Sequence, residues 1–349
     1  MITKIKLSIV LLLWSSALPI SAQSKWAQDQ FFKGEIELHV GEFKEALKYY
    51  SQAITYSPRY KEAYYSRAKT HMLMNDSSSA ILDFQKLIAL DSRDARAYFY
   101  IGYMAYQSQN YEAAISLFTK AIQLNAYYTL AYNYRAESYK ALDMNSLALA
   151  DYSQSLVLEP EEAQLYFGRA NAYLALNNFS AALTDFRQAF KLEPRNQEIL
   201  KLIIETNFLA ENYFETAQLI DQLRKSNPTL VEDHYHYISA LCKASVKDYR
   251  GAIEALSRFI EVKNDEPAYY EERASYYLKV NAFQPAIDDY QQAIAMAPDV
   301  AENYLACVNI YILQEDYTNA IRYLDLALLQ HQDYPEFWYL RGLSYLRSG

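Results

Sequence analysis

The sequence predicts an all-α protein in which short helices pair and the pairs stack into a solenoid. Two observations carry this prediction. The 349 residues contain only 7 Gly and 9 Pro, which is too few for a loop-rich or all-β chain. Four segments, beginning at Glu62, Leu130, Gln164 and Ala268, also align with one another without a gap. Their spacing is 34 residues or a multiple of 34, apart from two extra residues before the last segment.

The first stretch, residues 1–22, has the features of a secretory signal. Lys4 and Lys6 precede an apolar run over residues 7–18, and Ala22 is a suitable last residue before cleavage. This run is shorter than the ~20 residues that cross a bilayer, so a retained membrane anchor is the weaker alternative. No cysteine lies nearby to anchor a lipoprotein. We therefore expect an exported protein, in the periplasm or on the extracellular face of a bacterial envelope.

The charge of the chain excludes one class of partner. The formal net charge is −9, and it becomes −11 when Lys4 and Lys6 leave with the signal. Nucleic acid is a poor partner for such a surface. We expect instead a protein or peptide partner, and no integral membrane span once the signal is removed.

Nine frames of 34 residues follow, and each is expected to form two helices joined by a short turn. Small residues at the eighth and twentieth positions of a frame let the two helices approach closely, while aromatic residues at the fourth and twenty-fourth positions fill the space between neighbouring pairs. The frames are 27–60, 61–94, 95–128, 129–162, 163–196, 197–230, 233–266, 267–300 and 301–334.

Prolines mark the expected ends of these helices. Proline is tolerated in the first turn of a helix and ends a helix elsewhere. Pro267 and Pro335 stand where a first helix begins. The prolines that stand where a second helix ends are Pro58, Pro160, Pro194, Pro228 and Pro298.

The frames resemble the tetratricopeptide repeat family. The family pattern has an aromatic residue, a Leu-Gly pair and a Tyr on the first helix, then an Ala, an aromatic residue and a closing Pro. In the third frame the matching residues are Tyr98, Ile101, Gly102, Tyr111, Ala114, Phe118 and Ala121. In the fifth they are Tyr166, Ala170, Tyr173, Phe179, Ala182, Phe186, Ala189 and Pro194. The resemblance covers nearly all of the chain after the signal, and it implies a right-handed superhelix whose first helices line a concave groove.

A second regularity links two positions of the frame. Four frames have Arg at the seventh position, and the same four have Asp at the twenty-third, whereas the other five have neither. This joint presence predicts that the two side chains meet across the helix hairpin as a structural ion pair, replaced elsewhere by mostly apolar contacts. The predicted pairs are Arg67 with Asp83, Arg135 with Asp151, Arg169 with Asp185 and Arg273 with Asp289.

The resemblance also implies where a partner binds. In the family the fifth and ninth positions of the first helices are among those that line the groove. Here they combine aromatic, polar and charged residues, which suits a peptide with apolar side chains. The alternative for the fifth-position aromatics is that they pack against the neighbouring repeat. The candidate groove residues are Phe31, Tyr65, Lys69, Phe99, Tyr103, Asn133, Glu137, Phe167 and Asn171.

One subclass of the family grips the C-terminus of a chaperone with Lys and Asn at these two positions. Phe31 and Glu35 occupy them in the first frame, and Phe99 and Tyr103 in the third. Neither pair matches, so this function is not expected here.

No motif indicates catalysis, a cofactor or a metal. The chain has no Gly-rich phosphate loop, His-Glu-x-x-His or Cys-x-x-Cys. His234 and His236 are two residues apart and point in different directions on a helix. Cys242 and Cys307 fall two frames apart, about 20 Å in a stack of helix layers, too far for a disulfide. The sequence therefore predicts a non-enzymatic interaction scaffold.

Residues 335–349 read as the first helix of an incomplete tenth repeat. Arg341 stands at the seventh position, but its expected Asp partner lies beyond Gly349. The exposed aromatic residues of this helix suggest either self-association or a longer natural chain. In the second case the protein is the N-terminal sensing or recruiting arm of an envelope protein with a C-terminal effector domain.

Overall fold

A computed structural model describes residues 25–349, and for Leu230 it describes the backbone alone. The predicted signal, residues 1–22, lies outside the described residues. Within the described part, the chain forms nineteen α-helices and one short 3₁₀ turn, and no strand. The prediction of an all-α solenoid is confirmed.

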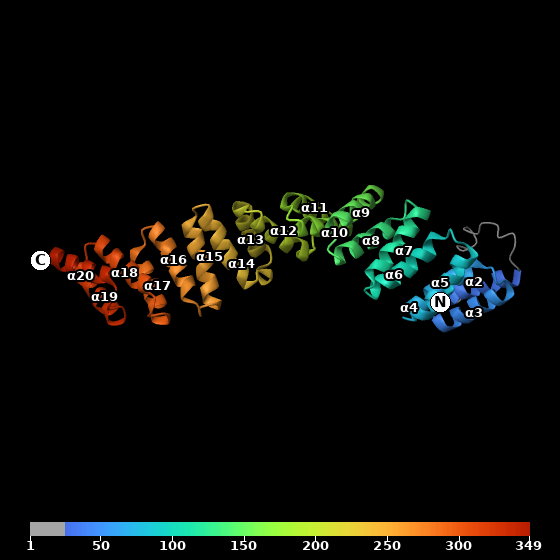
Figure 1. Cartoon of the computed structure of the whole chain (residues 1–349), viewed down its shortest axis with the longest axis horizontal. Coiled ribbons are helices and arrows are strands. Elements are labelled where there is room, and N and C mark those ends of the chain that lie inside the picture. The colour runs from blue at the N-terminus through green and yellow to red at the C-terminus, as the bar shows by residue number, and fades with distance from the viewer. Residues whose placement is uncertain (1–24) are drawn as a thin grey trace. The chain divides into compact units, whose positions relative to one another are not determined.

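The chain divides between Asn196 and Gln197 into two compact units. The helices of the first unit are α2 (Lys25–Val40), α3 (Phe43–Tyr56), α4 (Lys61–Leu73), α5 (Ser77–Leu90), α6 (Ala95–Gln107), α7 (Tyr111–Leu124), α8 (Thr129–Ala141), α9 (Asn145–Leu158), α10 (Ala163–Ala175) and α11 (Phe179–Leu192) (Figure 1).

The second unit contains the remaining frames and the extra helix. Its elements are α12 (Gln197–Leu209), α13 (Tyr213–Ser226), the 3₁₀ turn η2 (Pro228–Leu230), α14 (Asp233–Ser245), α15 (Tyr249–Val262), α16 (Pro267–Lys279), α17 (Phe283–Met296), α18 (Ala301–Leu313), α19 (Tyr317–Gln330) and α20 (Pro335–Ser348).

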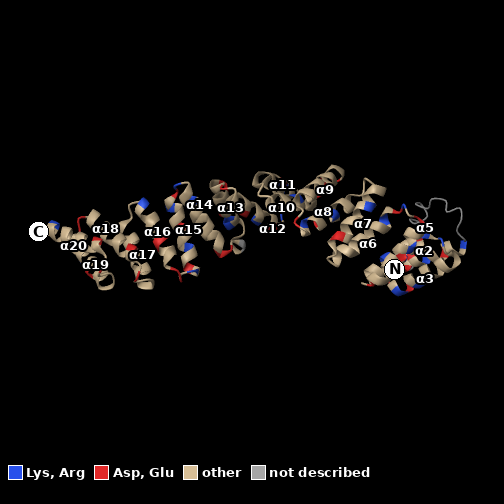
Figure 2. Cartoon of the chain, viewed as in Figure 1, with Lys and Arg blue, Asp and Glu red and all other residues tan. Residues whose placement is uncertain are grey.

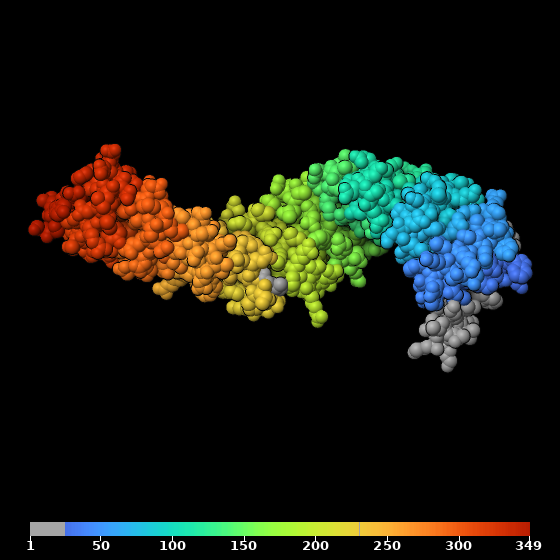
Figure 3. Space-filling model, turned by 90° about the horizontal axis from the view of Figure 1, so that it is seen from below, coloured from blue at the N-terminus to red at the C-terminus, as the bar shows by residue number. Residues whose placement is uncertain are grey.

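Each unit is a stack of helix hairpins. The two helices of a frame pack against each other, and the second helix also packs against the first helix of the next frame in the same unit. The space-filling view follows this order, with successive frames lying side by side within each unit (Figure 3). First helices of neighbouring frames also touch, as α2 and α4 or α6 and α8 do. A residue at one position of a frame therefore lies near its counterpart 34 residues later.

The turn inside each hairpin has the same backbone in every frame. Its fifteenth residue adopts the left-handed conformation, with φ of 89° at Gly41 and 61° at Gln109. Left-handed backbone ends a helix by satisfying its last carbonyl groups. In five frames the next residue caps the second helix with its side chain, and Asn110 does so by accepting a hydrogen bond from the Ala113 N–H.

The core between the helices combines small and aromatic residues. Ala114 and Phe118 of α7 are fully buried. A Cβ added to Gly102 of α6 would lie 3.0 Å from the ring of Phe118, and one added to Gly168 of α10 would lie 2.6 Å from the ring of Tyr152. The rings thus occupy space that only a very small residue on the facing helix leaves open.

Charged residues are mixed over both units. Figure 2 shows basic and acidic residues interspersed along the helices. Within the described residues, no helix is both long enough and apolar enough to cross a membrane.

Candidate functional site

The first helices α4 and α6 form a cleft of about 320 Å³ in the first unit. Lys69, Leu73, Tyr100, Tyr103 and Met104 are among its lining residues. The Leu73 side chain is 58% exposed, although it is large and apolar. The cleft therefore offers apolar and aromatic surface to solvent beside one cation, Lys69. Three uncharged polar residues, Asn75, Ser77 and Gln107, complete its lining.

The repeat geometry explains why two predicted residues meet here. Lys69 and Tyr103 both stand at the ninth position of their frames, on neighbouring first helices. The Lys69 ammonium lies 5.7 Å from the ring centre of Tyr65 and 6.0 Å from that of Tyr100. Such cation–π contacts favour an ammonium over the face of an aromatic ring. Among the described residues, no carboxylate lies within ion-pair distance of Lys69, so its charge is available to a partner.

Four apolar or aromatic lining residues, Met72, Leu73, Tyr100 and Met104, were missed by the sequence analysis. Met72 and Leu73 stand at the twelfth and thirteenth positions, and Tyr100 at the sixth. In the family that the sequence resembles, the twelfth and thirteenth positions line the groove. That signal could have found Met72 and Leu73. No such signal marks the sixth position. Tyr100 reaches the cleft because its ring stacks on the Phe84 ring, with 5.2 Å between the ring centres.

Phe99 is not a groove residue, and its prediction as one was wrong. Only 3% of Phe99 is exposed. Its ring lies 4.8 Å from the ring of Tyr128, 5.7 Å from Phe118 and 6.0 Å from Tyr134. Three aromatic neighbours from two frames enclose it, so the fifth position faces the core here.

The other fifth-position aromatics are only partly buried. The three of them that were predicted as groove residues each pack against the ring at the twenty-fourth position of their own frame, with ring centres 5.9 to 6.2 Å apart. Burial raises the pKa of the Tyr65 phenol. Contact of these residues with a partner stays a prediction. The three pairs are Phe31 with Tyr50, Tyr65 with Phe84 and Phe167 with Phe186.

The predicted polar residues Asn133, Glu137 and Asn171 lie outside the cleft between α4 and α6. The Glu137 carboxylate accepts a hydrogen bond from the Tyr152 hydroxyl and pairs with Lys140 at 2.8 Å. Burial, and then the charge of Glu137, raises the pKa of Tyr152. Asn171 donates to the Phe167 carbonyl at 2.9 Å. Glu137 and Asn171 thus form their hydrogen bonds with residues of their own frames.

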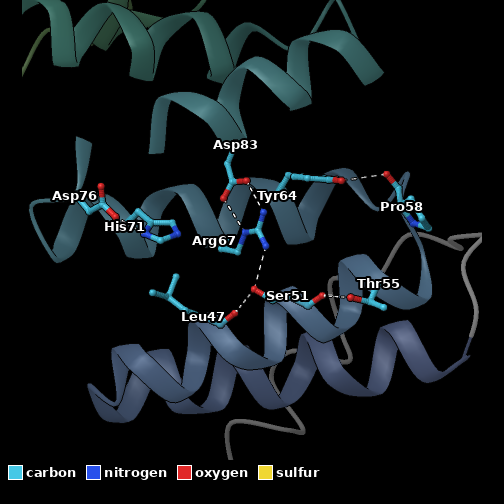
Figure 4. Close-up of polar contacts among 9 residues, drawn as sticks. All are labelled: Leu47, Ser51, Thr55, Pro58, Tyr64, Arg67, His71, Asp76 and Asp83. Atoms are coloured by element: carbon cyan, nitrogen blue, oxygen red, sulfur yellow. Dashed lines mark hydrogen bonds and ion pairs between the residues drawn. The ribbon is translucent and has the colours of Figure 1, made fainter. Parts of the chain in front are cut away.

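The four Arg–Asp pairs are present in the structure. Figure 4 shows Arg67 of α4 lying between α3 and α5. Its Nε and Nη2 donate to the Asp83 carboxylate at 2.8 and 2.6 Å, and its Nη1 donates to the Ser51 hydroxyl at 2.9 Å. The hydrogen bond to Asp83 raises the pKa of Arg67. One guanidinium therefore links three helices from two frames.

The hydroxyl in this network was missed, although the sequence holds a signal for it. The twenty-fifth position of a frame is Ser or Thr whenever the next frame has the Arg–Asp pair, and at no other frame. The other three networks join Arg135 to Asp151 and Thr119, Arg169 to Asp185 and Ser153, and Arg273 to Asp289 and Ser257.

The described residues include Cys242, Cys307 and His236, which are of the types that ligate metals or act as nucleophiles. They contain no cluster of three residues able to hold a metal ion. Cys242 and Cys307 are buried free thiols, and burial raises their pKa values to about 11 and about 12. A nucleophilic cysteine needs the opposite shift. Burial also lowers the pKa of His236.

This chain is similar to several known proteins, among them two relatives and one solved structure. Tetratricopeptide repeat protein 13 of Homo sapiens is 26% identical over 140 residues, which are 39% of this chain and 16% of that protein. Small glutamine-rich tetratricopeptide repeat-containing protein 2 of Mycosarcoma maydis is 37% identical over 60 residues, 17% of each protein. The matches span less than a fifth of either relative. The structure of Pseudomonas aeruginosa pilF is 19% identical, with a TM-score of 0.51 over 62% of this chain and 97% of that one. At this identity the likeness concerns the fold alone.

Models of protein families also match several segments of the chain. Four models, each described as tetratricopeptide repeat, match residues 30–60, 67–129, 163–196 and 277–343. Together these segments cover more than half of the chain, and they fall in both units. With the hairpins in register and the small and aromatic residues at the family's positions, the chain belongs to the tetratricopeptide repeat family.

Proposed function

We propose that this protein is a non-enzymatic scaffold that binds a peptide segment of a partner protein in the cleft between α4 and α6. The fold is one that protein-interaction scaffolds have, and the main support for the proposal is the cleft. A rigid array of hairpins supports its walls, so little ordering is needed when a partner binds. The partner segment inserts an apolar side chain between Leu73 and Tyr103 and places an acidic group against Lys69.

The Lys69→Glu variant is expected to weaken binding of such a peptide by about tenfold, roughly 1.4 kcal/mol. The reason is that a repulsive pair replaces an attractive one at the edge of a partly desolvated cleft. A random peptide library displayed on phage and selected on the wild-type chain supplies the ligand. Fluorescence anisotropy then measures its affinity.

Lys86→Glu is the matched control, because Lys86 is an exposed lysine on the second helix α5 and does not line the cleft. Its affinity should equal that of the wild type. Selected peptides without an acidic residue, or equal losses in both lysine variants, would contradict the proposed site.

We also propose that the protein acts outside the cytoplasm, in the periplasm or at the extracellular face of a bacterial envelope. The support is the pattern of residues 1–22, with Lys4 and Lys6 before a short apolar run. Expression in a Gram-negative host should give a periplasmic chain whose mass has fallen by that of the signal. An uncleaved chain in the cytoplasmic fraction would rule export out.

A further inference from the structure

The two tyrosines that line the cleft between α4 and α6 have rings held in place by other aromatic rings. The Tyr100 ring stacks on Phe84 with 5.2 Å between ring centres, and it meets Tyr65 edge-on at 5.8 Å. The Tyr103 ring meets Tyr134 of α8 edge-on at 5.0 Å. Both cleft tyrosines are only partly buried. The cleft therefore presents aromatic surface that loses little conformational freedom when a ligand packs on it.

The hydroxyl groups of these two tyrosines each accept a hydrogen bond from a neighbour. The Tyr65 hydroxyl donates to that of Tyr100 at 3.4 Å, and the Gln107 amide donates to that of Tyr103 at 3.0 Å. A phenol carries one proton and can both donate and accept. Since each hydroxyl already accepts a bond within the chain, its own proton is left to donate into the cleft.

The lining of the cleft is rich in hydrogen-bond donors. Besides the two tyrosines, the side chains that carry N–H or O–H groups are Lys69, Asn75, Ser77 and Gln107. No Asp or Glu is among the described residues that line it. A ligand with many acceptors and few donors is therefore the best match. A proline-rich backbone has this chemistry, because each proline keeps its carbonyl group and lacks the N–H.

Proline-rich segments also have a shape that fits the repeat. They adopt the polyproline II helix, which has three residues per turn, a rise of about 3.1 Å per residue and no internal hydrogen bonds. Its carbonyl groups are consequently open to the donors of the cleft. One turn spans about 9 Å, and helices that pack on each other lie about 8–10 Å apart. Prolines three residues apart therefore match the spacing of neighbouring first helices.

A second aromatic surface lies one frame further along the first unit, between the packed helices α6 and α8. The rings of Tyr106 and Tyr134 meet edge-on there at 5.4 Å, and both are partly buried. The contact between Tyr134 and Tyr103 joins this surface to the cleft. It can receive a second proline ring while the first lies between Leu73 and Tyr103.

Building on the proposed function, we infer that the partner segment is proline-rich and binds as a polyproline II helix with the pattern Pro-x-x-Pro next to an acidic residue. The first proline ring packs between Leu73 and Tyr103, and the acidic side chain pairs with Lys69. The second proline ring packs on Tyr106, one frame further along. The two cleft hydroxyls donate to carbonyl groups of the segment.

A fluorescein-labelled peptide of nine prolines with an Asp at each end tests this inference on the full chain. Fluorescence anisotropy should show saturable binding. A peptide of the same length with alanines in place of the prolines should bind at least about tenfold more weakly, because it is not preorganised and carries donors of its own. Of two peptides with equal numbers of Pro and Ala, the one with Pro at every third position should bind more tightly than the one with Pro at every second.

Two variants test the residues assigned to the segment. Tyr103→Phe keeps the ring and removes the hydroxyl, so it should weaken binding of the proline peptide by about fivefold through the loss of one hydrogen bond. Tyr106→Ala removes the second aromatic surface and should weaken binding by about tenfold. Tyr127→Phe and Tyr127→Ala are the matched controls and should bind as the wild type does. Tyr127 is 80% exposed between α7 and α8 and lies outside the cleft lining.

Equal affinities for the two proline spacings, or equal losses in the Tyr103→Phe and Tyr127→Phe variants, would overturn the inference. It would also fall if the proline peptide did not bind at about 1 mM while peptides from the phage library bound through Lys69 without a Pro-x-x-Pro pattern. The proposed function would stand in that case. If neither the library nor the proline peptide gave a binder, the proposed function itself would fail.

Discussion

Replacing Asp185 with Ala is expected to lower the free energy of unfolding of the first unit by about 3–5 kcal/mol. Asp185 is 4% exposed and receives two hydrogen bonds from Arg169, at 2.7 and 2.9 Å. Its removal leaves the guanidinium partly buried between three helices without a counter-charge. Urea unfolding followed by circular dichroism measures the loss.

The chain supplies its own control for this effect. In the frame 95–128 the two paired positions hold Ile101 and Leu117. The double variant Arg169→Ile with Asp185→Leu copies that apolar pair, so it should recover most of the stability lost in Asp185→Ala. Replacing both partners removes the unpaired charge, whereas replacing one creates it. A double variant as unstable as the single one would show that the ion pair has no apolar substitute in this frame.

Replacing Phe99 with Ala is also expected to cost about 3–5 kcal/mol, the usual range for a buried phenylalanine. The ring is enclosed by Phe118, Tyr128 and Tyr134, and its removal leaves a cavity that their rings cannot close without losing contacts. The thermal midpoint should fall by many degrees. A midpoint within about 2 °C of the wild type would place Phe99 on the surface after all.

Tyr103→Ala is the comparison for Phe99→Ala. Tyr103 stands one helical turn after Phe99, and its ring lines the cleft while packing against the edge of the Phe99 cluster. Its ring contacts the Tyr134 ring at 5.0 Å, so its removal should cost only about 1 kcal/mol. The two variants together separate a residue needed for stability from one that is available for binding.

The Arg–Asp pairs show how much a repeated sequence reveals about its own structure. Arg67 and Asp83 were paired from their joint presence in a frame, without knowledge of any contact. The inference works because each frame folds into the same hairpin, so one position in the frame corresponds to one place in space. The hydroxyl of Ser51 follows the same rule across a frame boundary, because it belongs to the frame that precedes the pair.

The groove was harder to predict because position in the frame does not determine burial. Lys69, Tyr103 and Glu137 all stand at the ninth position. Lys69 is exposed at the cleft, Tyr103 lines it, and Glu137 is held by the buried Tyr152. Each outcome depends on which side chains the neighbouring frames place opposite, and these differ along the chain.

The 34-residue spacing and the small and aromatic residues at its fixed positions were therefore enough to predict the helices, their pairing and their order. Those features depend on backbone geometry and on contacts that every frame repeats. The burial of Phe99 and the cleft between α4 and α6 appeared only in the tertiary structure. They arise from packing between particular neighbours, and a periodic pattern carries no information about such contacts.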